Sequence, residues 1–414
     1  IRYSKAMSDS LDLAGRPSWL DSSIELSSST LGAKTLFATD EWFARCDNLL
    51  KPEPPSFDPN AFCSEGKVMD GWESRRRREP GHDWCIIKLP YTSTPLGLEI
   101  NTAFFTGNYV PRISVQGANL ETLKDDSWLV GAKERVKRGG GVQGTAMSTS
   151  DVELAGKQCE EAGKWHILLQ QTPLRSGVEE TRMHRFDVDE EARTKPITHI
   201  RVNYFPDGGV ARLKLYGHVT RGSMEGVRGE LSSLVYGGRG IGCSNQHYGV
   251  PSNLLRVGTG VDMGDGWETA RHLDRPPIIK RDPATGLVDT QLHDWCILRM
   301  GCVVGEVEKL LIDTKWFKGN YPESVSIDYL YEPKGISGNG EGQWMPLLPR
   351  RRSGPDQLFT FETSELSISQ DTLITHLKLS IYPDGGVSRV RLFGKGKGKI
   401  EDQEGGDVAR KRKR

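Results

Sequence analysis

A carboxylate, a guanidinium and an imidazole lie within ten residues of one another as Glu73, Arg76 and His82. A carboxylate and a guanidinium three residues apart in a loop can hold opposite ends of a zwitterion-like or urea-bearing substrate. The imidazole can exchange a proton near neutral pH. Glu73 and Arg76 can equally pair with each other, and the sequence leaves both interpretations open.

The same residue types recur further along the chain. Glu268, Arg271 and His293 form the second set, and a Gly-Asn-Tyr sequence follows each set. Amide, phenol and guanidinium groups can hydrogen-bond a polar substrate. The residues predicted to be catalytic are Glu73, His82, Glu268 and His293. Those predicted to bind substrate are Arg76, Asn108, Tyr109, Arg112, Arg271, Asn320 and Tyr321.

The sequences around these residues are repeated as well. Asp-Gly-Trp-Glu occurs at 70–73 and 265–268, His-Asp-Trp-Cys at 82–85 and 293–296, and Pro-Asp-Gly-Gly-Val at 206–210 and 383–387. The spacing between partners changes only from block to block, which indicates fixed elements joined by loops of different length. A chain of 414 residues is long for one core. The predicted organisation is a partly ordered lead-in (1–30), a first repeat (31–217), a linker (218–235), a second repeat (236–394) and a basic disordered tail (395–414).

Period-two patterns predict the elements that position these residues. Residues 82–89 and 96–105 each read as a strand, and Cys85 and Cys296 are expected in the core rather than as nucleophiles. Residues 200–215 read as a hairpin around Pro-Asp-Gly-Gly, with a solvated outer face. That outer face is expected to carry Arg212, Lys214, Arg389 and Arg391. Short strands and Gly or Pro turns therefore predict an all-β protein of two tandem jelly-roll β-sandwiches from an internal duplication.

The first copy carries extra residues between 117 and 163. They include a basic, glycine-rich run at 133–141 that is expected to be mobile. Ser150 and Asp151 are expected to cap a short helix that Gly163 ends.

Composition argues against several classes of partner. Lys plus Arg and Asp plus Glu both total 55, so no global field favours nucleic acid. No apolar run reaches the roughly twenty residues needed to span a membrane, and residues 1–30 lack the apolar core of a signal peptide. Seven cysteines without a CxxC pair do not suggest a disulfide framework or a zinc site. We expect a cytoplasmic protein without metal or other cofactor, although the chain begins without Met and an upstream segment can be missing.

The repeated sequences together resemble those of the allantoicase family, over roughly residues 31–395. The resemblance rests on Asp-Gly-Trp-Glu-Ser-Arg at 70–75, Gly-His-Asp-Trp at 81–84, Thr-Gly-Asn-Tyr at 106–109 and the two Pro-Asp-Gly-Gly turns. It implies duplicated jelly rolls of galactose-binding-like type that hydrolyse allantoate to ureidoglycolate and urea in purine (allantoin) degradation. It also makes a homo-oligomer plausible. The alternative is a non-catalytic β-sandwich module that binds a sugar or a peptide.

The two copies differ around the candidate residues. About sixteen extra residues (211 − 195) separate the Trp-Glu and His-Asp sequences in the second copy, and Ser324 stands there in place of Arg112. A short connection loses less conformational freedom when it holds a substrate in one geometry. The first copy is therefore predicted to carry the chemistry. The alternative that arginines 75–78 form a solvated charge run stays open.

Overall fold

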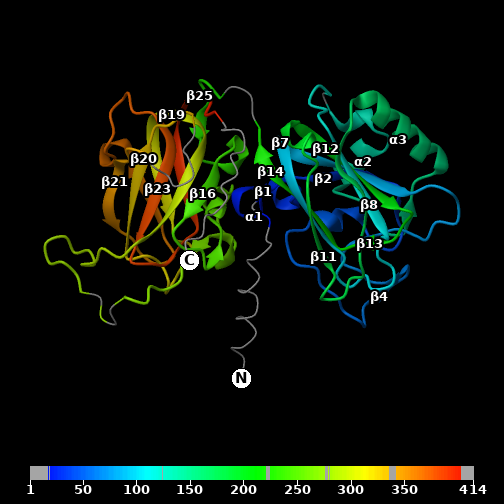
Figure 1. Cartoon of the computed structure of the whole chain (residues 1–414), viewed down its shortest axis with the longest axis horizontal. Coiled ribbons are helices and arrows are strands. Elements are labelled where there is room, and N and C mark those ends of the chain that lie inside the picture. Colours follow the sequence, from blue (N-terminus) through cyan, green and yellow to red (C-terminus); the bar gives the residue numbers. More distant parts are fainter. Residues whose placement is uncertain are drawn as a thin grey trace. The chain divides into compact units, whose positions relative to one another are not determined.

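The structure, a computed structural model, describes residues 17, 19–123, 125–220, 224–275, 278, 280–334 and 342–401. The chain divides into two compact units, residues 1–220 and 221–414, and each is built mainly of antiparallel strands (Figure 1). All-β sandwiches from an internal duplication are confirmed, because the two units share one strand order. Residues 1–16 of the expected lead-in and residues 402–414 of the expected tail lie outside the described part.

In the first unit, strand β7 (Asp83–Asn101) belongs to both layers of the sandwich. Its first half pairs with β12 (Ile197–Phe205) and β2 (Lys34–Ala38), and its second half with β14 (Arg212–Val219) and β11 (Met183–Asp187). The layers are completed by β8 (Arg112–Ala118), β10 (His166–Pro173) and β1 (Ile24–Glu25). The two strands predicted at 82–89 and 96–105 are thus one strand. A register shift bends it near its middle rather than ending it.

The second unit repeats this arrangement around β19 (Asp294–Asp313). The partners of β19 and the outer strands are β16 (Arg239–Cys243), β20 (Ser324–Leu330), β21 (Met345–Arg352), β22 (Leu358–Glu362), β23 (Ile374–Tyr382), β25 (Arg389–Gly398) and β15 (Arg228–Glu230). Short strands lie in the loops: β3 (Asp40–Glu41), β4 (Phe62–Cys63), β5 (Gly66–Lys67), β6 (Trp72–Glu73), β9 (Thr145–Ala146), β13 (Gly209–Val210), β17 (Tyr248–Gly249), β18 (Trp267–Glu268) and β24 (Gly386–Val387). The α-helices are α1 (Trp19–Ser22), α2 (Ala132–Arg138) and α3 (Thr149–Ala162).

The Pro-Asp-Gly-Gly turn does not close a hairpin, and that prediction was wrong. The strand before it, β12, pairs with β7 and β8, whereas the strand after it, β14, pairs with β7 and β1. The turn therefore carries the chain from one layer to the other. Both strands alternate because each sends its apolar side chains into the same core from opposite layers. Gly209 is required within the turn, since a Cβ atom there would overlap the ring of Phe105.

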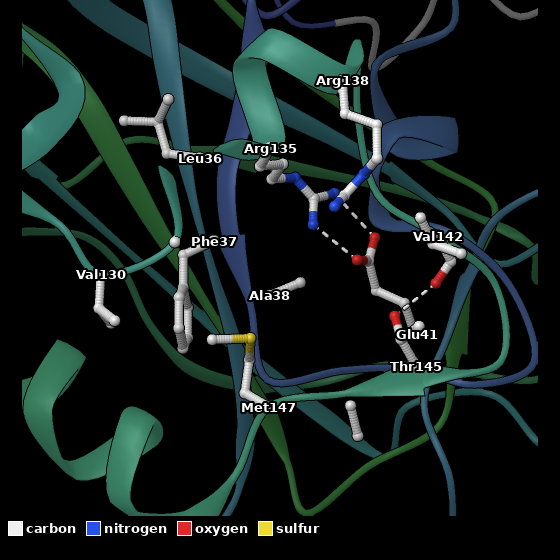
Figure 2. Close-up of a pocket in the computed structure, with 12 residues that line it drawn as sticks. Leu36, Phe37, Ala38, Glu41, Val130, Arg135, Arg138, Val142, Thr145 and Met147 are labelled. Carbon is white, nitrogen blue, oxygen red and sulfur yellow. Dashed lines mark hydrogen bonds and ion pairs between the residues drawn. The ribbon is translucent and has the colours of Figure 1, made fainter. Parts of the chain in front are cut away.

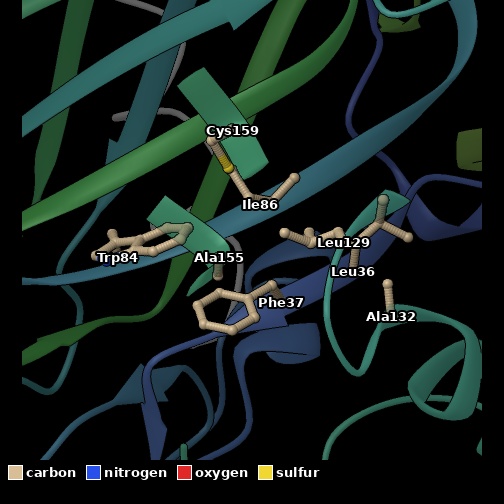
Figure 3. Packing of buried hydrophobic residues seen from close by; sticks show 8 residues of the cluster. All are labelled: Leu36, Phe37, Trp84, Ile86, Leu129, Ala132, Ala155 and Cys159. Carbon is tan, nitrogen blue, oxygen red and sulfur yellow. The ribbon is translucent and has the colours of Figure 1, made fainter. Parts of the chain in front are cut away.

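The core contains the two cysteines predicted for it. Cys85 and Cys296 are fully buried, and so are the tryptophans of the repeated sequences, Trp72 and Trp267. The opposite face of β7 is covered too, because Trp84 and its neighbours pack under α2 and α3 (Figure 3). That cluster comprises Leu36, Phe37, Trp84, Ile86, Leu129, Ala132, Ala155 and Cys159.

Arg212 and Arg389 are not on a solvated face, and this prediction was also wrong. Each is 2% exposed and forms an ion pair of 2.6 Å, with Asp70 and Asp265 respectively. A buried guanidinium requires such partners, because an unpaired charge in the interior is costly. The Asp of each repeated Asp-Gly-Trp-Glu sequence therefore anchors the strand that follows the turn.

The basic run at 133–141 is ordered, in contrast to the expected mobility. Its residues up to Arg138 form α2, in which Arg135 is buried and donates to both carboxylate oxygens of Glu41. This ion pair fixes the helix against β2 and β3. The helix predicted after it is present as α3, but Ser148 is its N-cap, and Gly163 ends it as expected.

Two buried histidines predict acid-sensitive folding. His199 and His376 occupy equivalent positions and bond a neighbouring Thr hydroxyl through Nδ1 at 2.8 Å, and burial lowers their pKa values from 6.5 to about 4 and about 3. The unfolded chain therefore binds protons at a higher pH than the folded chain. Lowering the pH from 7 to 5 should cost about 2 kcal/mol per histidine.

Urea unfolding at pH 7 and pH 5 measures this loss. His199→Gln and His376→Gln should each reduce the pH dependence of the unfolding free energy. Asp70, whose pKa is lowered to about 2 by Arg212 and Lys51 despite its burial, titrates below this window and does not contribute. An unfolding free energy that is equal at both pH values would contradict the prediction.

Candidate active site

Three of the repeated sequences meet at the Pro-Asp-Gly-Gly turn. β6 pairs with β13, and the Asn108 carbonyl accepts from the Gly209 amide at 2.8 Å. The Asn108 side chain donates to Oε1 of Glu73 at 2.6 Å, and Asn320 donates to Glu268 at the same distance. Glu73 therefore pairs with Asn108 rather than with Arg76. Burial raises its pKa, and the Asn108 hydrogen bond acts against this shift.

Asn108 is therefore expected to stabilise the turn. Asn108→Leu would leave a carboxylate oxygen of Glu73 without its donor, so the free energy of unfolding should fall by about 1–3 kcal/mol. Asn320→Leu should cost less, since Glu268 is only half-buried. Urea unfolding of both variants tests this, and an unchanged unfolding free energy for Asn108→Leu would refute it.

The arginine that points inward is Arg77. It pairs with Asp83 at 3.0 Å and its backbone amide donates to Asp207 at 2.9 Å. In the second unit His272 stands at this position, 3.3 Å from Asp294. Arg76 and Arg271 are exposed, and no ion pair joins either of them to another residue of the described part. The substrate-binding roles of Arg76 and Arg271 stay predictions.

His82 lines a polar hollow of about 320 Å³ on the outer face of the first unit's sheet, beside β12. The residues around it are His82, Ser114, Gln116, Ile167, Leu169, Gln170, Gln171, Arg201, Asn203 and Phe205. The strand register explains this grouping, because residues paired across antiparallel strands share a face. Gln116 pairs with Arg201 and Ser114 with Asn203. Arg112 pairs with Phe205 in the same row, so it stands on that face at its end.

Asn203 fixes the protonation pattern of His82. Its Oδ1 accepts from Arg201 Nε at 3.0 Å and lies 3.2 Å from His82 Nε2, while its Nδ2 donates to Ser114 at 3.1 Å. An amide oxygen only accepts, so His82 Nε2 must carry a hydrogen. Burial lowers the pKa of His82, and the nearby cations Arg201 and Arg77 contribute. The neutral ring then keeps its lone pair on Nδ1, the atom that a general base needs.

Arg201 supplies a positive charge to the hollow. Its guanidinium stacks on the indole of Trp84, with a distance of 4.1 Å to the ring centroid. In the described part of the chain no carboxylate is in ion-pair contact with it, and burial lowers its pKa. The carboxylate of Glu160 acts on Arg201 electrostatically but does not pair with it, so this half-buried cation can still form an ion pair with an anionic ligand.

Comparisons with known proteins agree with this architecture. The family model for the allantoicase repeat matches residues 24–220 and 229–397. A probable allantoicase from Pseudomonas syringae pv. tomato is 36% identical over 380 residues, which are 90% of this chain and 96% of that protein. The chain belongs to the allantoicase family. A probable allantoicase from Photobacterium profundum is 34% identical over 379 residues, or 90% of this chain and 96% of that protein.

A solved structure supports the same assignment. The crystal structure of the allantoicase from Saccharomyces cerevisiae is 28% identical in sequence, with a TM-score of 0.62 over 90% of this chain and 93% of that one. The predicted family and the two-sandwich fold are thereby confirmed.

The second allantoicase repeat has different chemistry at the positions equivalent to the hollow. Lys378 replaces Arg201, and the carboxylate of Asp328 stands opposite it in the strand register. Ser380 replaces Asn203, and the exposed His293 has its Nδ1 2.9 Å from the Gln291 carbonyl oxygen. Burial raises the pKa of Asp328, while Lys378 and His293 oppose the shift. Arg350 stacks on Tyr382 of this face, 3.9 Å from the ring centroid, but its guanidinium donates to the Ser324 hydroxyl and to the carbonyls of Thr290 and Val288.

Arg201, Asn203, Ser114 and Gln116 of the first allantoicase repeat were missed from the sequence. They occupy the polar positions of two strands with alternating sequences, and that pattern is also typical of an ordinary solvated face. The described residues contain no group of three or more His, Cys, Asp and Glu side chains placed to hold a metal ion, and none of their helices is long and apolar enough to cross a membrane.

Proposed function

We propose that this chain hydrolyses allantoate to ureidoglycolate and urea, and that the reaction takes place in the His82 hollow of the first repeat. Membership of the allantoicase family supports the reaction. The observation that supports the location is an unpaired, half-buried Arg201 beside a histidine whose tautomer is fixed. The second repeat lacks this combination.

Allantoate carries a carboxylate on a carbon that also bears two ureido groups. Arg201 binds the carboxylate, since a guanidinium can donate two parallel hydrogen bonds to it. Ser114 and Gln116 offer donors and acceptors to the ureido groups, and so do Gln170 and Gln171 on β10. Arg112 supplies a second cation at the end of the row and contributes to attracting the anion.

His82 moves the proton. Its Nδ1 takes a proton from water, and the water oxygen bonds to the central carbon as the bond from that carbon to one ureido nitrogen breaks. The imidazolium then returns the proton to the leaving nitrogen, which completes urea and leaves a hydroxyl group on ureidoglycolate. Asn203 holds the ring through Nε2 throughout, and the Asn oxygen stabilises the imidazolium that forms transiently.

Glu73, Asn108 and Tyr109 support the site by holding the turn that follows β12. The isolated bridge between Tyr109 and Gly209 places this loop beside the turn. Glu268, Asn320 and Tyr321 hold the equivalent turn in the second repeat. Self-association and a cytoplasmic location stay predictions from the sequence.

Urea release from allantoate by the purified full-length chain tests the proposal. Turnover that depends on enzyme concentration is expected, with ureidoglycolate formed in equal amount. Glycan or peptide affinity without turnover would favour the alternative of a non-catalytic sandwich module.

A further inference from the structure

The first unit contains a second cavity, of about 240 Å³, that shares no lining residue with the His82 hollow. It lies between β2, α2 and the segment that follows α2. One wall is apolar and the other carries charged groups (Figure 2). The apolar lining residues are Leu36, Phe37, Ala38, Val130, Val142, Ala146 and Met147, of which Val142 lies on the side of Glu41 and Arg138 (Figure 2).

The deeper charged groups of this cavity already satisfy one another. Both oxygens of Glu41 accept from Arg135, and Oε1 also accepts from the Cys46 amide at 2.8 Å. Arg135 further donates to Asp47 at 2.8 Å and to the Thr35 carbonyl at 3.1 Å. These groups therefore shape the cavity without calling for a further partner.

The cation at the rim is different. Arg138 is exposed, and its Nε donates only to the Gly140 carbonyl, at 3.3 Å, so within the described part of the chain its charge has no carboxylate partner. Arg135 of the same helix is neutralised by Glu41 and Asp47, but the helix also carries the exposed cations Lys133 and Lys137 against one carboxylate, Glu134. The local field therefore favours an anion at the mouth of an apolar cavity.

The cavity volume limits the apolar part of a ligand. A dry cavity of about 150 Å³ accepts benzene, so about 240 Å³ holds a single ring with a short acidic arm. Allantoate fits poorly, because its two ureido groups would face an apolar wall without hydrogen-bond partners.

We propose that this cavity is a binding site for a small aromatic monocarboxylate, with the ring against Phe37 and Met147 and the carboxylate on Arg138. The site belongs to the first repeat alone. The segment that builds it runs for 47 residues between β8 and β10 (119–165), whereas only 14 residues (331–344) join the equivalent strands β20 and β21.

A bound ring would be reported by a tryptophan. Phe37 lines the cavity and stacks on Trp84, with ring centroids 4.6 Å apart. Contact of a bound ring with Phe37 should change the surroundings of Trp84 and so shift its indole N–H resonance in an NMR spectrum. Trp84→Phe identifies that signal among the ten tryptophans. Because Trp84 also stacks with Arg201 beside the His82 hollow, the shift is assigned to this cavity only if Ala146→Phe abolishes it. The readout requires no turnover, so it does not depend on the proposed reaction.

Titration of the full chain with phenylacetate tests the proposal. We expect saturable binding with Kd below about 1 mM, as ligand efficiencies allow for ten heavy atoms. Arg138→Gln should weaken binding about tenfold, through loss of a charge-assisted hydrogen bond. Lys137→Gln is the matched control, because it removes a neighbouring exposed charge that does not line the cavity, and it should leave Kd unchanged.

Two further arms complete the test. Ala146→Phe fills the mouth from an exposed position and should abolish binding. Phenylacetamide, which has the same shape without the charge, should bind about tenfold more weakly than phenylacetate. Titration of the wild type that does not saturate, or unchanged binding to Ala146→Phe, would overturn the proposal. So would equal losses of phenylacetate affinity in Arg138→Gln and Lys137→Gln, or equal affinity of the wild type for phenylacetamide and phenylacetate.

Discussion

Replacing Arg201 with methionine is expected to lower kcat/KM for allantoate by about a hundred- to a thousandfold. Arg201 is the one arginine or lysine among the residues that line the His82 hollow, and methionine retains the contact with Trp84 while removing the charge. Loss of a bidentate, partly desolvated bond to a carboxylate corresponds to about 3–4 kcal/mol of transition-state stabilisation. Urea release measured over a range of allantoate concentrations gives this value, and circular dichroism reports whether the variant folds.

Lys378→Met provides the matched control in the second repeat. Lys378 occupies the equivalent strand position but stands opposite Asp328 in the strand register, so this carboxylate offsets part of its attraction for an incoming anion. We expect kcat/KM to change less than about threefold. A large loss from Lys378→Met with little loss from Arg201→Met would place the reaction in the other repeat.

The fold was predictable because the sequence contains it twice. Sequences kept in both copies are those that both sandwiches need, and the structure shows why. Asp70 and Asp265 anchor buried arginines, and Asn48 and Asn253 donate to the carbonyls of Gly71 and Gly266 at 3.0 and 2.9 Å. The repeated residues thus hold the loops and turns at one position in each sandwich.

The pairing of strands could not be read in the same way. Alternation in residues 200–215 shows that two strands each bury one face, but it does not tell whether they bury it in one sheet or in two facing sheets. The burial of Arg212 depended on Asp70, which lies 142 residues away in the sequence. Likewise, α2 is ordered because Arg135 meets Glu41, 94 residues earlier.

The candidate site was only partly predictable, for a related reason. A search for repeated residues finds what two copies share, whereas a site present in one copy appears as a difference between them. Arg201 against Lys378 and Asn203 against Ser380 are such differences, in strands that otherwise agree closely. His82 was found because its neighbours Asp83 and Trp84 are needed in both repeats, and Arg112 was found because the copies differ at that position.

His82→Gln is expected to lower kcat by about a hundred- to ten-thousandfold, the usual contribution of a positioned general base. Glutamine keeps a donor for Asn203 but has no lone pair of comparable basicity. In the wild type, kcat/KM should be constant at and above neutral pH and should fall as the pH drops through the pKa of His82, which burial holds below its ordinary value of 6.5.

The pH profile separates this role from a structural one. A variant that is only partly folded would lose activity by the same factor at every pH, so kcat/KM would still fall at acidic pH (the acidic limb of the profile). His82→Gln should instead retain a low rate that does not fall at acidic pH. His293→Gln is the matched control, because the exposed His293 has its Nδ1 against the Gln291 carbonyl and lacks an asparagine partner, so activity should stay within about threefold of the wild type. If the acidic limb survives in His82→Gln and disappears in His293→Gln, then the base lies in the second repeat.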